Sequence, residues 1–200
     1  MTFLLATRNP KKAQEIQRLL RGTGIRLRSV DRFPDLPQVR ETGGTFRENA
    51  LLKAVGISKR TILPVLAEDS GLEVRALGGK PGVHTARFAG PQQNDARNNQ
   101  KLLRVLRGLP PSKRQARFVC CMVLAIGGRP IKTFQAACAG TIAQDLIGKT
   151  GFGYDPLFIP AGFKKTMAQL GPGTKDRISH RTKVVARLAV WIKKYPQINP

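Results

Sequence analysis

The chain has few acidic residues, few aromatic residues and no long apolar run. Its 200 residues include 12 Asp and Glu against 35 Lys and Arg, for a formal net charge of +23, and aromatic residues make up 6%. No apolar run approaches the roughly 18 residues of a membrane-spanning helix, so we expect no span. The apolar start at residues 1–6 is too short for a signal peptide, and no basic segment precedes it.

Cysteine is also scarce, and it is not arranged for metal binding. Cys120, Cys121 and Cys138 are odd in number, lie in apolar runs and lack the spacing of a zinc site. We therefore expect buried free thiols in a reducing compartment, and a cytoplasmic protein. The basic excess attracts polyanions such as nucleotides or nucleic acid, and charge alone does not choose between these partners.

The N-terminal part of the chain predicts a βαβ unit. A strand is expected at residues 2–6 and another at 25–30. Between them a helix opens within residues 7–12 and ends at Gly22 and Gly24. The length suits one domain with a substantial core.

The rest of the chain mixes helices with antiparallel strands. Thr45 and Glu48 form a capping box, so a helix should run over 46–59 and Glu48 has a structural task. A helix at 94–107 should turn four apolar residues inward, namely Leu102, Leu103, Val105 and Leu106. Other expected elements are strands at 62–66 and 72–77, a hairpin of 115–126 and 131–138, a further run at 140–143, and a helix within 175–195. This order predicts an α/β fold, with a mixed central sheet, flanking helices and two lobes around a substrate cleft.

The stretch Glu68-Asp69-Ser70-Gly71 stands between two of the apolar runs. Asp, Ser and Gly are common turn residues, so a polar turn is the simpler interpretation. Carboxylates at the end of a buried strand are nevertheless costly unless they are paired or bind a cation. Glu41 lies nearby in the sequence and has no evident structural task. Three carboxylates are therefore candidate oxygen ligands for Mg²⁺: Glu41, Glu68 and Asp69.

Basic residues provide candidate phosphate ligands. The strand-to-helix turn at 7–12 carries Asn9 and Lys12, and a helix N-terminus offers free N–H groups to an anion. This turn is not a Walker loop, because the glycines of that motif are missing. Lys53 lies one turn beyond Asn49 and shares its helix face.

Together these residues predict Mg²⁺-dependent chemistry on a nucleotide or phosphate ester. A metal-bound water activated by a carboxylate would attack phosphorus in line. Phe152 would stack on a base, and Asp155, His180 and Arg181 would contact its edge. Simpler interpretations remain open: Phe152 as core filling, His180 as an ordinary helix N-terminal residue, and Arg87 as the ion-pair partner of a buried acid rather than a phosphate contact.

A series of short motifs follows in order along the chain. They are Thr7-x-Asn9-x-x-Lys12, Glu41-Thr42-Gly43-x-Thr45-Phe46-x-Glu48-Asn49-Ala50-x-x-Lys53-Ala54, Ala67-Glu68-Asp69-Ser70-Gly71-Leu72, Gly79-x-Pro81-Gly82-Val83 with Ala86-Arg87-Phe88, Gly151-Phe152-Gly153-Tyr154-Asp155-Pro156, and Ser179-His180-Arg181. In this series the chain resembles the inosine/xanthosine triphosphate pyrophosphatase family, the Ham1-like enzymes for non-canonical purine nucleotides. The resemblance runs from Ala6 to about Leu188.

The resemblance implies a single ITPase-like domain over residues 1–200, with two lobes around a deep cleft, and a homodimer. It implies Mg²⁺-dependent hydrolysis of ITP, dITP or XTP to the monophosphate and pyrophosphate. Asp69 resembles the family's general base and a metal ligand, with Glu41 beside the metal. The implied phosphate and sugar contacts are Thr7, Arg8, Asn9, Pro10, Lys11, Lys12, Lys53, Ser70 and Lys175. The implied purine pocket, which favours a 6-keto base, comprises Phe152, Gly153, Tyr154, Asp155, His180 and Arg181.

The sequence also departs from the family pattern. Glu68 stands where the family commonly has Asp, which adds a methylene at a candidate metal ligand. Gly171-Pro172-Gly173-Thr174 replaces the usual acidic residues before Lys175, and the charge of +23 is unlike the family.

Two other functions are compatible with the sequence. One is a Maf-like pyrophosphatase of other nucleotides, against which Ser179-His180-Arg181 argues. The other is a non-catalytic nucleic-acid-binding protein on the same fold, which the basic excess permits. The low aromatic content and the lack of an RNP-like or helix-turn-helix motif leave nucleic acid as a partner only through non-specific charge.

Overall fold

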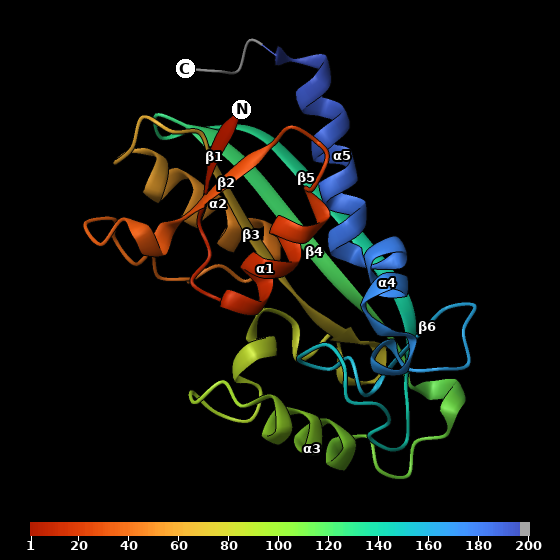
Figure 1. The fold of residues 1–200 in the computed structure, drawn as a ribbon. Helices are drawn as coiled ribbons and strands as arrows, with labels where there is room; N and C mark the ends of the chain where they lie inside the picture. Colours follow the sequence, from red (N-terminus) through yellow and green to blue (C-terminus); the bar gives the residue numbers. More distant parts are fainter. Residues whose placement is uncertain (197–200) are drawn as a thin grey trace. The chain divides into compact units, whose positions relative to one another are not determined.

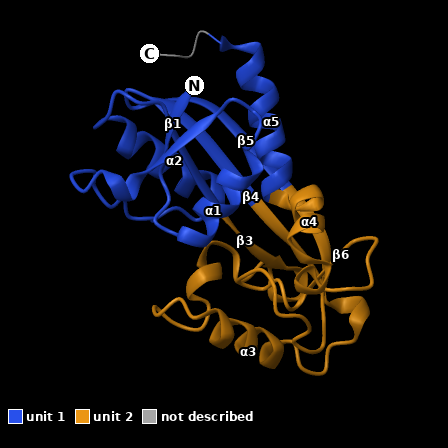
Figure 2. Ribbon diagram, in the orientation of Figure 1, with its two compact units in different colours: residues 1–69, 120–136, 181–200 blue, residues 70–119, 137–180 orange. Residues whose placement is uncertain are grey.

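The computed structural model describes residues 1–196, and the chain forms two compact units (Figures 1 and 2). Unit 1 comprises Met1–Asp69, Cys120–Ala136 and the described residues from Arg181 onward. Unit 2 comprises Ser70–Val119 and Ala137–His180. Each unit is therefore assembled from separate stretches of the sequence.

The sheet has six strands in the order β2-β1-β3-β4-β5-β6. Their bounds are β1 Thr2–Leu5, β2 Arg26–Ser29, β3 Val65–Val74, β4 Gln115–Ile126, β5 Arg129–Ile142 and β6 Phe158–Pro160. β1 pairs in parallel with β2 and β3, whereas β5 pairs antiparallel with β6. The expected mixed sheet and the initial βαβ unit are confirmed.

Five α-helices accompany the sheet in the described part of the chain. They are α1 Pro10–Leu19, α2 Phe46–Ser58, α3 Asp95–Val105, α4 Met167–Ile178 and α5 His180–Lys194. The capping box predicted for α2 is present, because Thr45 accepts from the Glu48 amide while the Glu48 carboxylate accepts from the Thr45 amide. None of the described helices is long and apolar enough to cross a membrane.

The stretch Glu68-Asp69-Ser70-Gly71 lies inside β3, so the prediction of a turn between two short strands is wrong. β3 is one strand of ten residues and is buried along almost all of its length. A Cβ on Gly71 would lie 2.7 Å from the Thr85 Cβ and 2.8 Å from the Gly82 carbonyl oxygen. The glycine is therefore required by a close backbone approach and not by a turn.

The single helix expected within 175–195 is also wrong, because two helices occur there. α4 and α5 are separated at Ser179, whose backbone is extended. α4 begins at Met167 behind a capping box of Thr166 and Gln169, and it contains a non-helical residue, Gly171. The Gly-Pro-Gly sequence that follows Leu170 is typical of a loop, which is why the sequence did not predict α4.

α3 and β5 also differ in detail from the sequence-based prediction. Leu102 and Leu106 are fully buried, but Val105 is 41% exposed, because it is the last residue of α3 and lies beside the buried stripe. The run at 140–143 continues β5 and is not a further strand.

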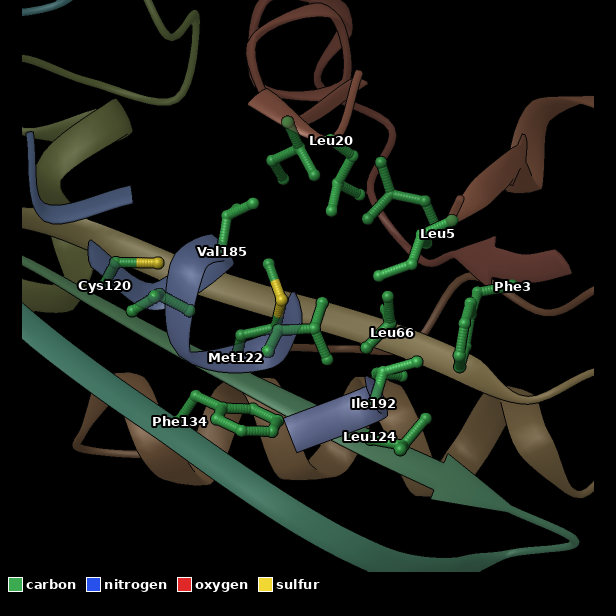
Figure 3. Packing of buried hydrophobic residues seen from close by; sticks show 14 of the residues in the cluster. Phe3, Leu5, Leu20, Leu66, Cys120, Met122, Leu124, Phe134, Val185 and Ile192 are labelled. Carbon is green, nitrogen blue, oxygen red and sulfur yellow. The ribbon is translucent and has the colours of Figure 1, made fainter. Parts of the chain in front are cut away.

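In unit 1, α1 and α5 pack against the strands. Leu20, which directly follows α1, and Val185 of α5 belong to one cluster with Leu5, Leu66 and Met122 of β1, β3 and β4 (Figure 3). Burial of this apolar surface stabilises unit 1.

Unit 2 has its own core, to which Leu72, Leu102 and Phe158 contribute. The three cysteines are buried and free, as predicted.

Candidate active site

Asp69 is a buried acid on β3, with 5% of its surface exposed. Asn49 Nδ2 of α2 donates a hydrogen bond to Asp69 Oδ2 at 3.1 Å. Burial raises the pKa of Asp69 above its usual value; Lys12 and Lys53 oppose that shift, and the charges of Glu41 and Glu68 add to it. Burial and the two neighbouring acids make the ionised form of Asp69 unfavourable. A bound cation would stabilise that ionised form.

Lys53 connects Glu41 to β3. Its Nζ lies 2.7 Å from Glu41 Oε1 and 2.8 Å from the backbone oxygen of Glu68. The predicted sharing of one face of α2 by Asn49 and Lys53 is consistent with these contacts, since both side chains reach residues of β3. α2 therefore holds an amide and a cation beside the acids of β3.

Glu68 is fully buried and is paired with cations. Its Oε1 lies 3.2 Å from Lys12 Nζ and 3.4 Å from Arg181 Nη2. Cys120 Sγ donates to its Oε2 at 3.5 Å. Both carboxylate oxygens of Glu68 therefore have partners within the protein.

Glu15 is a buried acid of α1 that was not predicted from the sequence, and 2% of its surface is exposed. Its Oε2 pairs with Arg181 Nη1 at 2.7 Å. Glu15 lies three residues after Lys12, so both side chains lie on the same side of α1. Its position beside Ile16, on the apolar side of α1, could have indicated a buried acid.

The turn at 7–12 caps α1. Asn9 Oδ1 accepts from the Lys12 amide at 3.2 Å, and Thr7 Oγ1 accepts from the Asn9 amide at 3.2 Å. Arg8 donates to the Leu36 carbonyl group at 3.2 Å, while Pro10 and Lys11 are exposed. Asn9 thus has a capping role in addition to its predicted phosphate contact.

The donor set of unit 1 fits Mg²⁺ bound through few carboxylates. In residues 1–196 no group of three His, Cys, Asp or Glu is placed to hold a metal ion. Mg²⁺ commonly takes one or two carboxylates and completes its shell with water and substrate phosphates. Asp69, whose ionisation Glu41 opposes, supplies the hard oxygen and the charge that such a cation would neutralise.

In unit 2, Asp155 organises the loop at 151–156. Its Oδ2 accepts from the Phe152 amide at 2.9 Å and from Lys175 Nζ at 2.6 Å. The same Lys175 Nζ lies 4.3 Å from the centre of the Phe152 ring. Three predicted site residues are therefore brought together, with Phe152 under a cation.

Two residues of α3 that the sequence did not single out hold Gly153. Asp95 Oδ2 accepts from the Gly153 amide at 3.0 Å, and Asn99 Nδ2 donates to the Gly153 carbonyl group at 2.8 Å. Tyr154 donates its hydroxyl to the Thr85 carbonyl group at 2.9 Å, and burial raises the pKa of this phenol. Contacts between α3 and this loop could not be read from spacing, because more than fifty residues separate them.

His180 and Arg181 are neighbours with different contacts. His180 stacks on Phe118 in unit 2, with ring centres 4.9 Å apart and an angle of 11°. Arg181 forms its ion pairs with Glu15 and Glu68 in unit 1. Their contact with a purine stays a prediction.

Ser70 and Arg87, two further residues considered as phosphate contacts, differ in exposure. Ser70 is buried, with 3% of its surface exposed. Arg87 is exposed and pairs with no acid in the described part of the chain, which removes its interpretation as the partner of a buried acid.

The chain is similar in sequence to known proteins over most of its length. A family model described as the Ham1 family matches residues 3–191. A dITP/XTP pyrophosphatase of Geobacillus kaustophilus is 51% identical over 186 residues, covering 93% of this chain and 91% of that protein. A dITP/XTP pyrophosphatase of Syntrophobacter fumaroxidans is 45% identical, covering 93% of this chain and 79% of that protein.

Solved structures show the same similarity. A HAM1 protein from Coxiella burnetii superposes with a TM-score of 0.88 at 38% identity, covering 97% of this chain and 99% of that chain. A nucleoside-triphosphatase / dITP/XTP pyrophosphatase from Mycobacterium abscessus superposes with a TM-score of 0.78 at 41% identity, covering 94% and 98%.

Proposed function

This chain belongs to the Ham1 family, and from that premise we propose that it hydrolyses ITP, dITP and XTP to the monophosphate and pyrophosphate. The observation that carries the proposal is the buried Asp69 carboxyl group, with Lys12, Lys53 and two further acids acting on it. Relatives named dITP/XTP pyrophosphatase, 51% and 45% identical, support this substrate class. Neither the Maf-like activity nor a purely binding function gains support from these relatives.

We assign the general base to Asp69. A carboxylate of ordinary pKa is a weak base at neutral pH, and burial moves the pKa of Asp69 toward the working pH. The hydrogen bond from Asn49 Nδ2 orients this carboxyl group. Asp69 would accept the proton of the water that attacks phosphorus.

The positive charges of unit 1 would bind the triphosphate. Lys12 and Lys53 already act on Asp69, and the N-terminus of α1, which is the positive end of the helix dipole, lies within the same turn. Charge that develops on the leaving pyrophosphate would be stabilised by cations held in place before the reaction. Ser70 and Lys175 complete the proposed phosphate and sugar contacts.

Asp69 and Glu41 would hold the proposed Mg²⁺, with Glu68 nearby. Bound there, the cation would supply charge neutralisation for the phosphates and a more acidic water. The protein's own contribution is to keep Glu41 beside Lys53, and Glu68 beside Lys12 and Arg181, so that Asp69 is not surrounded by uncompensated negative charge.

We assign the purine base to the loop of unit 2 and to residues 180 and 181. Phe152 offers a ring face, and Asp155 and Lys175 fix the loop around it. The amides of Gly153 and Tyr154 belong to the same loop, and His180 and Arg181 complete the set proposed to accept a 6-keto base.

A cytoplasmic homodimer is part of the proposal. Light scattering coupled to gel filtration would give twice the chain mass of 21.9 kDa for a dimer. A mass equal to that of one chain would rule out the homodimer and would not affect the proposed hydrolysis.

Product analysis tests the reaction itself. With ITP and Mg²⁺, phosphorus NMR should show inosine monophosphate and pyrophosphate in equal amounts. Inosine diphosphate with free phosphate would mean cleavage at the outer anhydride, and the proposed pyrophosphatase would be wrong.

A further inference from the structure

A cavity of about 950 Å³ lies in unit 2 beside α3. We call it the α3 groove. Its cationic lining residues are Arg97, Lys101, Arg104, Arg107 and Arg114, and Asp145 is the one acid among its described lining residues. None of these residues belongs to the proposed catalytic set, so the groove is a separate feature of the molecule.

Two of these cations are engaged by the protein. The Arg114 side chain is buried and donates to three backbone carbonyl groups at 2.6–2.8 Å. Lys101 Nζ donates to the Phe88 carbonyl group and lies 4.6 Å from the centre of the Phe88 ring. The fixed Arg114 forms part of the wall of the groove.

Arg97, Arg104 and Arg107 are exposed, and none of them forms an ion pair in the described chain. Arg104 and Arg107 lie near the C-terminal end of α3, where a cation interacts favourably with the helix dipole. Arg97 lies in the first turn, where a cation opposes that dipole. Arg97 therefore gains nothing from the helix dipole, and its exposed charge can face a ligand of negative charge.

The positions of these cations indicate a ligand with repeated charges. Among the exposed cations, Arg104 and Arg107 lie about one turn apart, and Arg97 lies two turns before Arg104, roughly 10 Å away at a rise of about 1.5 Å per residue. Spacing by one turn suits phosphates separated by a sugar. Neighbouring phosphates of inorganic polyphosphate share an oxygen and lie closer together.

The other lining residues indicate how such a ligand would be recognised. Among the described residues, the lining contains no aromatic side chain on which a base could stack. Gln100 and Gln144 add neutral hydrogen-bonding groups. A strand would therefore be bound through its backbone and without preference for sequence.

We propose that the α3 groove binds the phosphodiester backbone of a single nucleic-acid strand. The net charge of +23, which nucleotide hydrolysis does not require, would attract such a strand, and the groove would hold it. This binding goes beyond the proposed hydrolysis and does not depend on it.

The test is the salt dependence of binding to a fluorescein-labelled oligothymidylate, measured by anisotropy without nucleotide or Mg²⁺. The variant combines Arg97→Gln, Arg104→Gln and Arg107→Gln. The plot of log affinity against log salt has a negative slope, and each phosphate contact contributes about 0.7 to its magnitude for a single strand. Loss of three contacts should therefore make the slope shallower by about 2.

A matched control removes the same charge elsewhere. Arg26, Arg60 and Arg129 are exposed residues of unit 1, and replacing all three with Gln gives an equal change in net charge. Thermal unfolding of both triple variants checks that they remain folded. The control should keep the wild-type salt slope.

Equal losses in the two triple variants would assign binding to the overall charge and overturn the groove. Tight binding of inorganic polyphosphate by a protein that does not bind the oligonucleotide would overturn the assignment to nucleic acid. A shallower salt slope in the groove variant alone supports the proposal. This holds whether or not the protein hydrolyses ITP.

Discussion

Asp69 is buried among charges of both signs, and these charges act on its ionisation in opposite directions. Burial favours the neutral acid, while Lys12 and Lys53 favour the carboxylate. Since the net effect raises its pKa, Asp69 binds a proton more readily than an exposed aspartate does. Both the activity and the stability of the protein should respond to this residue.

Asp69→Asn should lower kcat by at least about 100-fold, since general-base catalysis contributes roughly 10²–10⁴-fold. Asparagine keeps the size and the hydrogen-bonding capacity of the side chain but cannot accept the proton. Steady-state pyrophosphate release measures the loss, and circular dichroism checks the fold. Full activity of this variant would remove Asp69 from the role of base.

The same substitution should not reduce stability. Because the pKa of Asp69 is raised in the folded state, the folded protein retains this proton to a higher pH than the unfolded chain does. Wild-type stability therefore falls as the pH rises through the unfolded pKa toward the folded pKa, and the ionised group remains unfavourable at pH 7. In metal-free buffer at pH 7, Asp69→Asn should unfold at the wild-type temperature or above it.

A clear decrease in its midpoint would show that the carboxylate is stabilised in the folded state, against the direction of this pKa shift.

Single residues also show where prediction from sequence succeeded. The structural role of Glu48 was predicted from a capping box, a pattern of neighbouring residues. Such a pattern can be predicted because its partners are only three residues apart. Glu15 and Asn99 acquire their importance from partners far away in the chain, Arg181 and Gly153. No periodicity identifies such pairs.

Among the secondary-structure elements, α1 and α5 of unit 1 are joined by a buried ion pair. Glu15 and Arg181 each expose 3% of their side chains. Removing one partner leaves the other charge buried and uncompensated, which is the costly way to break such a pair. Arg181 keeps its contact with Glu68, so part of the compensation remains.

Glu15→Gln should lower the free energy of unfolding by about 3 kcal/mol, at the low end of values for broken buried pairs. Urea unfolding measures the change at constant slope. Glu48→Gln is the matched control, because glutamine also serves at that position of a capping box, and it should change stability by less than about 0.5 kcal/mol. Equal stabilities of the two variants would contradict the importance of the pair.

In unit 2, α3 holds the loop at 151–156 through Gly153. Asp95→Ala removes the acceptor of the Gly153 amide, and Asp95→Asn keeps an oxygen there. We expect KM for ITP to rise by about tenfold in the alanine variant, equivalent to about 1.4 kcal/mol of lost binding.

The asparagine variant should lie closer to the wild type, and the midpoint of thermal unfolding should change little in either. Unchanged KM in the alanine variant would mean that Gly153 is positioned without Asp95.

The elements themselves were predicted unevenly. Amphipathic spacing and caps gave α1, α2 and α3, whose ends lie within a few residues of the expected ones. β3 and α4 were mispredicted because their residues have the wrong local preference: charges inside a strand, and a Gly-Pro-Gly sequence inside a helix. Tertiary contacts, such as the cations around Glu68, override that preference.

In the whole molecule, the two compact units are not consecutive segments of the chain. β3, β4 and β5 each contribute residues to both units, so composition shows no boundary, and a single domain was the natural expectation. The order of strands and helices was enough to predict a mixed sheet. The substrate cleft and the dimer stay predictions of the resemblance.

The proposed hydrolysis gives a role to the carboxylates of unit 1 and to the loop of unit 2, but it does not explain the charge of the whole chain. A net charge of +23 raises the local concentration of any polyanion, including nucleotides that are not substrates. Selectivity must therefore come from contacts with the base and cannot come from the phosphates, which all nucleoside triphosphates share.

Turnover of ITP, dITP and XTP should accordingly be compared with turnover of ATP and GTP, with and without Mg²⁺, by pyrophosphate release. We predict Mg²⁺-dependent hydrolysis of the first three, with kcat/KM at least about 100-fold above that for ATP. A site that hydrogen-bonds a 6-keto group discriminates against the 6-amino group of ATP, because its polar groups would be left unpaired. Equal turnover of all five nucleotides, or none of any of them, would contradict the proposed function.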